Sequence, residues 1–105
     1  IAPLSQHNGI YSSYHLYVVR VKSLDSTMHT ALVTQLRESG IFAHVHYIPI
    51  HLQPYYQNLG FKKGDYPNAE RYYQQAITLP MFPDLSEDDV ASIVSTLIKH
   101  VDNLR

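Results

Sequence analysis

The chain has 105 residues, a formal net charge of −1 and no cysteine. This length fits one domain, and 45% hydrophobic residues with 16% charged residues is typical of a globular protein. The composition excludes a disulfide framework, a thiolate zinc site and a cysteine nucleophile, and no charge cluster or long apolar run indicates nucleic acid or membrane as a partner. We therefore expect a cytoplasmic protein.

The first predicted elements are a strand and a helix. Residues 14–21 are rich in valine and tyrosine, which favours a strand, and both faces of this strand are apolar enough for the centre of a sheet. Ser26 is predicted to cap a helix that ends at Gly40 in a left-handed conformation. Its apolar positions recur at helical spacing: Met28, Ala31, Leu32 and Leu36.

The middle of the chain is predicted to hold a second strand and a short helix. Residues 41–48 read as a strand that Pro49 should end, because proline offers no hydrogen-bond donor to a sheet. Residues 54–59 favour a short helix closed by Gly60, and a polar loop should follow over residues 61–66.

Two helices and a third strand are predicted in the last 40 residues. Ala69, Tyr72, Tyr73 and Ala76 mark one face of a helix, and the strand over residues 77–80 follows it directly. The final helix should begin at Ser86, with Asp89 as its capping-box partner. It carries a continuous apolar stripe: Val90, Ile93, Val94, Leu97, Ile98 and Val101.

The order of these elements predicts an α+β fold. Three short strands form a small, mainly antiparallel sheet, and each helix must bury one face against it or against another helix. We expect one domain over residues 1–105, with no internal repeat or linker.

The stretch GIFAHVHYIPIH, residues 40–51, holds the candidate chemistry. In a strand, His44 and His46 would share a face at a spacing that suits zinc, with His51 as a third ligand. Glu38 is the one acidic residue nearby, so ordinary hydrogen bonding is the preferred interpretation and no metal site is predicted. Histidine and tyrosine around a proline favour a binding surface for a sugar or its diphosphate. No glycine-flanked nucleophile turn or glycine-rich phosphate loop is present.

Four pieces of the chain, in order, resemble the C-terminal domain of the DegT/DnrJ/StrS family of pyridoxal-phosphate-dependent nucleotide-sugar aminotransferases. The most specific is GIFAHVHYIPIH, since the family pattern is Gly-Ile followed by Val-His-Tyr-x-Pro-x-His. The sequence is most similar to aminotransferases of pseudaminic-acid-type pathways. His44 falls at a position that this pattern leaves free. The other pieces are SSYHLYVVRV (12–21), YPNAERYYQQAITLP (66–80) and FPDLSEDDV (82–90).

This resemblance implies the small C-terminal domain of a homodimeric fold-type-I transaminase. Such an enzyme moves an amino group from glutamate to a nucleotide-linked ketosugar in polysaccharide or glycan biosynthesis, using pyridoxal phosphate held by a lysine. The four lysines of this chain lie at a predicted strand end, in a loop and on the polar side of a helix: Lys22, Lys62, Lys63 and Lys99. None fits the Schiff-base role, so the cofactor is expected in a large N-terminal domain that this chain lacks. The chain alone is predicted to be inactive.

The resemblance also assigns site residues. His46, Tyr47 and His51 are predicted to face the active site and contact the sugar or its diphosphate, with His15 as a weaker candidate for the same cleft. One alternative is a non-catalytic module of the same fold that binds sugar or metal. Another is a relative without the Schiff-base lysine that serves as a sugar dehydratase.

Overall fold

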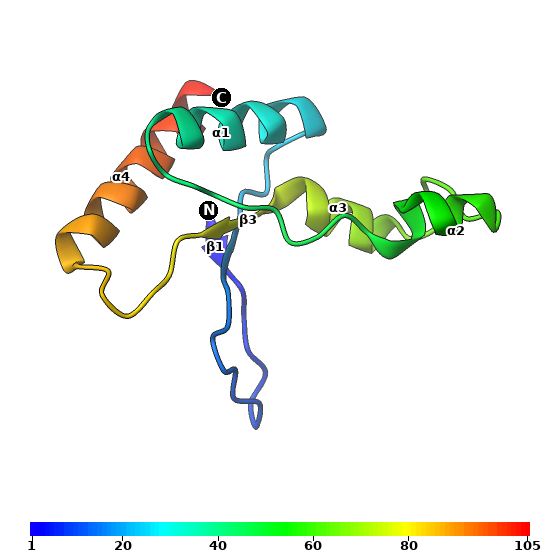
Figure 1. Ribbon diagram of the computed structural model, residues 1–105, viewed down its shortest axis with the longest axis horizontal. Helices are drawn as coiled ribbons and strands as arrows, with labels where there is room; N and C mark the ends of the chain where they lie inside the picture. The colour runs from blue at the N-terminus through cyan, green and yellow to red at the C-terminus, as the bar shows by residue number, and fades with distance from the viewer.

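Strand β2 (Tyr17–Arg20) lies at the centre of the sheet in the structure, a computed structural model that describes residues 1–105. It pairs antiparallel with β1 (Ala2–Pro3) on one side and with β3 (Ala76–Leu79) on the other (Figure 1). The predicted central position is confirmed, although the strand has four residues rather than eight. The residues between β1 and β2 form a long loop that projects from the sheet.

The register divides the sheet into two faces of different character. Val19 lies opposite Ile77 on the face that meets the hydrophobic core. Because side chains alternate along a strand, Arg20 and its partner Ala76 lie on the other face, as do Val18 and Thr78. We call this second surface, which carries Arg20, Ala76, Val18 and Thr78, the outer face.

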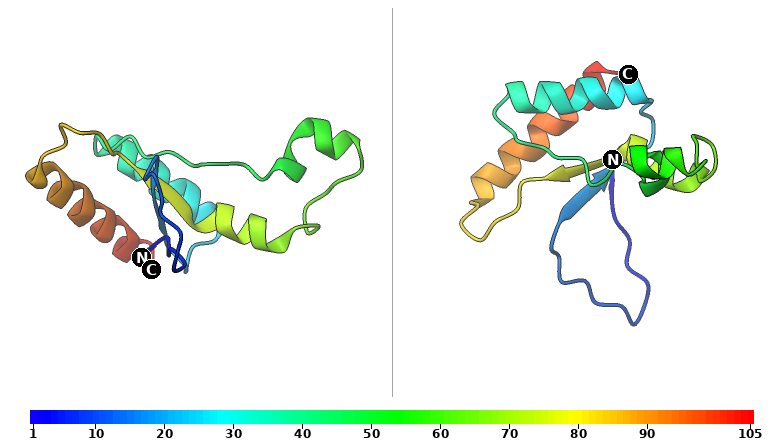
Figure 2. Two further views of the ribbon diagram at one scale, coloured as in Figure 1. Left: turned by 90° about the horizontal axis from the view of Figure 1, so that it is seen from below. Right: turned by 45° about the vertical axis from the view of Figure 1, so that its right-hand side comes forward.

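Helices α1 (Ser26–Glu38) and α4 (Glu87–Asn103) cover the core face of the sheet (Figures 1 and 2). Their buried side chains join those of β2 and β3 in one apolar cluster. Its members are Val19, Val21, Leu24, Leu32, Leu36, Ile41, Ala43, Ile77, Leu79, Leu97 and Val101.

Capping residues set the ends of α1. Its N-cap is Asp25, whose Oδ1 accepts a hydrogen bond from the Met28 amide at 2.8 Å. The prediction that Ser26 caps this helix is therefore wrong by one residue, because both side chains suit the position and the carboxylate fills it. Gly40 has φ of +82°, which confirms the predicted left-handed end.

Helix α4 begins as predicted. Ser86 Oγ accepts from the Asp89 amide at 3.1 Å, and Asp89 Oδ2 accepts in return from the Ser86 amide at 3.2 Å. This reciprocal pair is the capping box. Only part of the expected apolar stripe is covered, since Leu97 and Val101 are buried while Val90, Val94 and Ile98 are 43–46% exposed.

Residues 41–48 do not form the predicted strand. A single bridge joins His44 to Thr78, with amide–carbonyl distances of 3.0 and 2.8 Å, after which the chain leaves the edge of β3. The residue pattern indicates an extended chain, but a ladder also needs a free partner edge, and β3 has only four residues and follows α3 directly. The third strand is instead β1, and the fold class, an α+β three-stranded antiparallel sheet with helices, is confirmed.

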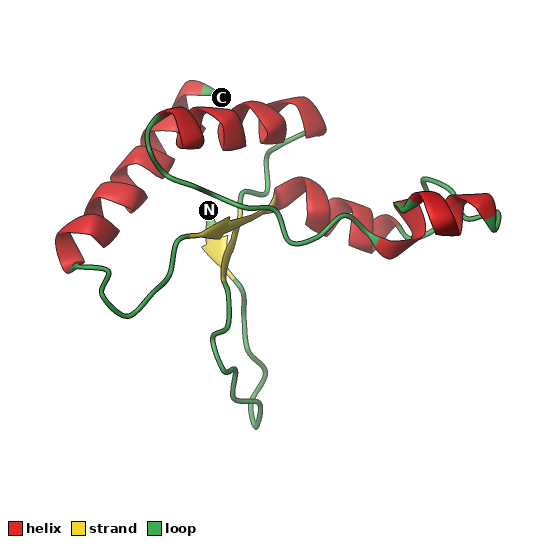
Figure 3. Cartoon of the chain, viewed as in Figure 1, coloured by secondary structure: helices red, strands yellow, loops and turns green.

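An arm of short helices extends from the sheet (Figure 3). It contains the 3₁₀ turn η1 (Ile50–Leu52), α2 (Pro54–Asn58) and α3 (Pro67–Gln75), and α3 passes straight into β3. Ala76, predicted in the helix, is the first residue of that strand. The radius of gyration is 15.3 Å, above the roughly 13 Å of a compact chain of this length. None of the helices combines the length and apolarity required to cross a membrane.

Candidate functional site

His46 rests on the outer face of the sheet. Its Nδ1 lies 2.8 Å from Oγ1 of Thr78, a buried residue of β3. The ring of His44 stacks beside it, with centroids 5.8 Å apart. A threonine hydroxyl both donates and accepts, so this contact holds the His46 ring in either tautomer and leaves Nε2 for another partner.

Tyr47 is next to His46 in space as well as in sequence. Its ring meets the His46 ring edge to face, with centroids 4.5 Å apart, and the residue is 68% exposed. The structure therefore brings together two of the four predicted site residues. A half-buried imidazole and an exposed phenol provide a polar tip and an apolar ring surface at one place.

His51 lies in the arm and is buried. Its Nε2 is 2.8 Å from Glu70 Oε1, and the same carboxylate oxygen accepts from the Gly64 amide at 2.7 Å. The Tyr66 ring packs against the imidazole, with centroids 4.9 Å apart. The hydrogen bond from His51, and then that from Gly64, hold the pKa of the Glu70 carboxyl below its usual value. His51 thus ties η1 to α3 and to the loop before it.

His15 is exposed in the segment that leads into β2. No hydrogen bond or ring contact joins it to His46, Tyr47 or His51. The four predicted residues therefore occupy three places: the outer face of the sheet, the arm and the start of β2.

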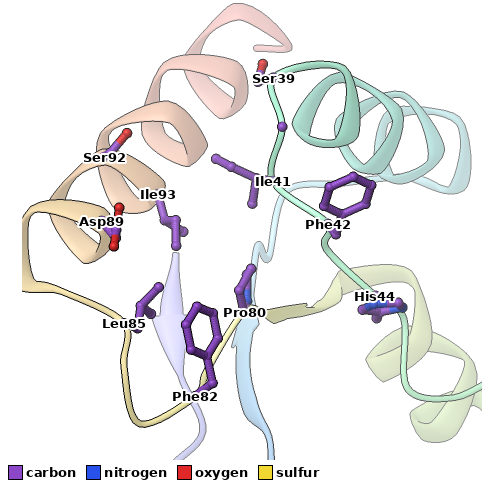
Figure 4. Close-up of a pocket in the computed structure, with 11 residues that line it drawn as sticks. Ser39, Ile41, Phe42, His44, Pro80, Phe82, Leu85, Asp89, Ser92 and Ile93 are labelled. Carbon is purple, nitrogen blue, oxygen red and sulfur yellow. The ribbon is translucent and has the colours of Figure 1, made fainter.

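The structure has two hollows near these segments, and His51 is the one predicted site residue that lines either of them. One of about 600 Å³ lies between the end of α1, the β3–α4 loop and the first turns of α4, where Figure 4 shows Phe42 and Phe82 and, at one side, His44. The other, of about 420 Å³, lies in the arm and is almost wholly apolar. It is lined by Ile50, His51, Tyr56, Phe61, Tyr66 and Ala69.

Metal ligands are not gathered anywhere in the structure. No group of three or more histidine, cysteine, aspartate or glutamate side chains comes together closely enough to hold an ion. His44 and His46 stack, but no third ligand joins them.

Comparison with known proteins decides the family. The model of the DegT/DnrJ/EryC1/StrS aminotransferase family matches residues 2–98. The chain belongs to this family. Among curated relatives, the DegT/DnrJ/EryC1/StrS chain is 36% identical over 100 residues to the spore coat polysaccharide biosynthesis protein SpsC of Bacillus subtilis, covering 92% of this chain and 25% of that protein. It is 31% identical over 94 residues to the UDP-4-amino-4,6-dideoxy-N-acetyl-beta-L-altrosamine transaminase of Helicobacter pylori, covering 90% and 25%.

Solved structures of aminotransferases have the same fold. The putative sugar aminotransferase Spr1654 of Streptococcus pneumoniae, in its PMP-form, superposes with a TM-score of 0.93 at 32% identity, over 99% of this chain and 26% of that one. Its PLP-form gives the same TM-score. Helicobacter pylori PseC gives 0.73 at 30% identity, over 88% of this chain and 24% of PseC. The DegT/DnrJ/EryC1/StrS chain thus spans about a quarter of the length of the relatives it matches.

The residues present in this family member do not fit pyridoxal phosphate. All four lysines, Lys22, Lys62, Lys63 and Lys99, are exposed, and none lines either hollow. A Schiff-base lysine requires shelter from water to react as a free amine.

Sequence reasoning missed two residues of the outer face. Thr78 holds His46, and Arg20 is on the same face of the neighbouring strand. The arginine was visible as a charge inside a valine-rich strand, which is a signal of a specific partner.

Proposed function

We propose that this chain is the small C-terminal domain of a pyridoxal-phosphate-dependent aminotransferase that transfers an amino group from glutamate to a nucleotide-linked ketosugar. The parent enzyme acts as a homodimer, and its large domain holds the cofactor. The observation that carries the proposal is the family match over residues 2–98, combined with His46 and Tyr47 placed together on the outer face.

The relatives support a sugar substrate. Two of them are named for sugar-linked work, the altrosamine transaminase of Helicobacter pylori and the UDP-4-amino-4-deoxy-L-arabinose–oxoglutarate aminotransferase of Shewanella sediminis. A sugar has hydroxyl groups that need hydrogen-bond partners and carbon faces that need an apolar surface. His46 and Tyr47 offer both.

The residues of this chain bind and orient in the proposed enzyme. Thr78 holds Nδ1 of His46, so Nε2 is the atom that meets a sugar hydroxyl or phosphate oxygen. Tyr47 presents its ring beside that atom. His51 supports the arm through Glu70, and His15 remains a candidate at the start of β2. The cofactor, held elsewhere, supplies the carbanion chemistry of transamination.

The test is His46→Ala in the full-length protein. We expect kcat/KM for the nucleotide sugar to fall by roughly tenfold to a hundredfold, because a positioned hydrogen bond to a bound group is removed. The visible spectrum of the bound cofactor should stay unchanged. His7→Ala is the control, because His7 is exposed and makes no side-chain hydrogen bond or ring contact. Full sugar turnover by His46→Ala would contradict the site assignment.

A further inference from the structure

Arg20 differs from every other cation of the chain. Of the eight lysine and arginine residues, it is the one that is not exposed. It stands on the central strand of the sheet, between Val19 and Val21, both of which are buried in the core. A charge in that position needs a reason, because transfer of a cation away from water is unfavourable unless it is paired.

The contacts within the chain do not pair this charge. Nη2 of Arg20 donates to Oε1 of Gln75, a neutral acceptor, at 2.7 Å, and the guanidinium lies 5.9 Å from the centroid of the Tyr72 ring. Nε is buried and has no acceptor. The two ion pairs of the structure lie elsewhere, between His51 and Glu70 and between Lys62 and Asp65. The guanidinium therefore keeps N–H donors that no acceptor of these 105 residues uses, and that water or a ligand can fill.

The residues that flank Arg20 on the outer face are small. On the outer face its neighbours across the sheet are Ala2 on β1 and Ala76 on β3, both with small side chains. His46 reaches the same face through Thr78 of β3. Arg20 lies on β2, along one edge of β3, and the segment that carries His46 bridges the other edge of β3 at His44 and Thr78. A substrate that contacts both residues would therefore lie across β3 on the outer face.

We propose that Arg20 binds an oxyanion of a substrate on the outer face. This inference rests on the proposed function, which supplies two such groups: the carboxylate of the amino donor and the diphosphate of the nucleotide sugar. A guanidinium presents parallel N–H donors that match either group, whereas a lysine offers only a point charge. Gln75 and Tyr72 fix the plane of the guanidinium before the ligand arrives.

Chemical labelling tests the contact without an activity assay. The full-length protein is treated with phenylglyoxal, and the labelling rate at each arginine is followed by peptide mass mapping. Glutarate is the carboxylate probe and inorganic pyrophosphate is the phosphate probe. We expect one of them to slow labelling of Arg20 at least fivefold. Arg105, exposed beside the core face of the sheet, is the control and should not be protected.

Kinetics with two variants separates binding from support of the fold. In Arg20→Met we expect KM to rise roughly tenfold or more for the substrate whose probe gives protection, with less than threefold change in KM for the other substrate. Arg20→Lys should recover only part of the loss, because it restores charge without the fork. Arg105→Met should match the wild type.

Three results would overturn the inference. They are equal labelling of Arg20 with and without both probes, full rescue by lysine, and a lowered melting temperature in Arg20→Met with both KM values unchanged. A protein that transaminates a nucleotide sugar but gives one of these results retains the proposed function and loses the inference. A protein that shows protection of Arg20 but no transamination retains the oxyanion site and loses the proposed function.

Discussion

Thr78 is the residue on which the orientation of His46 depends. Its hydroxyl is buried on β3 and makes the one hydrogen bond of the His46 side chain. Nothing in the sequence of β3 indicates this role, since a threonine in a strand is ordinarily explained by β propensity alone. Thr78 becomes the partner of His46 because the fold places residues 44–46 beside the outer face of the sheet.

Thr78→Val tests this dependence in the full-length enzyme. Valine keeps the shape and removes the hydroxyl, so we expect kcat/KM for the sugar to fall about twofold to tenfold, the range for one lost neutral hydrogen bond. The effect should not add to that of His46→Ala, because both changes remove the same interaction. Steady-state kinetics on the two single variants and the double variant measures the coupling. Additive losses would show that Thr78 acts by another route.

Glu70 carries the clearest link between pH and stability. Its pKa is lowered by the hydrogen bond from His51 and then by that from the Gly64 amide. A carboxyl whose pKa is lower in the folded state stabilises the fold above its ordinary pKa of 4.5, and this contribution is lost as pH falls through the lower folded value.

Glu70→Gln should therefore be less stable than the wild type at neutral pH. Below the ordinary pKa of Glu70, the variant should lose less stability with falling pH than the wild type does. Thermal melts of the full-length protein from about pH 7 to pH 3 measure both effects. Glu38→Gln is the control, because Glu38 is exposed on α1 and makes no side-chain hydrogen bond or ion pair. If the melting temperature of Glu70→Gln fell with pH as steeply as that of the wild type, Glu70 would not be the source of the acid sensitivity.

At the scale of elements, the ends of the helices were predictable from sequence, but the pairing of short segments in the sheet was not. The capping box of α4 and the left-handed Gly40 follow from residue types and spacing, and both are confirmed. Strand β1 has two residues, one of them Pro3, and no local pattern indicates it. Residues 41–48 show the reverse case, an extended pattern for which the fold supplies a single bridge.

Ser86→Ala tests the capping box. Loss of the hydroxyl leaves the Asp89 amide without an acceptor and removes the contact that contributes most to the lowered pKa of the Asp89 carboxyl. We expect a destabilisation of about 1 kcal/mol, the usual cost of losing such a cap. Denaturant unfolding of the full-length protein measures it. Ser95→Ala, inside the same helix, is the control and should be neutral or slightly stabilising because alanine has the higher helix propensity.

At the scale of the molecule, few residues of the chain are buried. Eighteen of the 105 residues are buried, and the radius of gyration exceeds that of a compact domain. Val90, Val94 and Ile98 lie exposed along α4. The family was predictable from sequence because its specific motif is local, whereas no motif marks the exposed apolar side of α4 as a contact surface.

The isolated 105-residue chain should associate in solution through this uncovered side of α4. Apolar side chains at helical spacing drive association when no partner covers them. Ile98→Lys should shift the chain toward the monomer, as measured by sedimentation velocity over a range of concentrations. Ser95→Lys is the control for added charge on the same helix. If the wild type and Ile98→Lys sedimented alike at every concentration, the exposed side of α4 would not be the surface of association.

The junction of α3 with β3 has a mechanical consequence. Gln75 ends the helix and Ala76 begins the strand with no loop between them. The other connection of the arm to the sheet runs through residues 44–49, which include His46 and its bond to Thr78. The arm therefore joins the sheet at two points, and one of them has no intervening loop. Because these two points carry Thr78 and His46, chain connectivity couples the position of the arm to both residues of the proposed sugar contact.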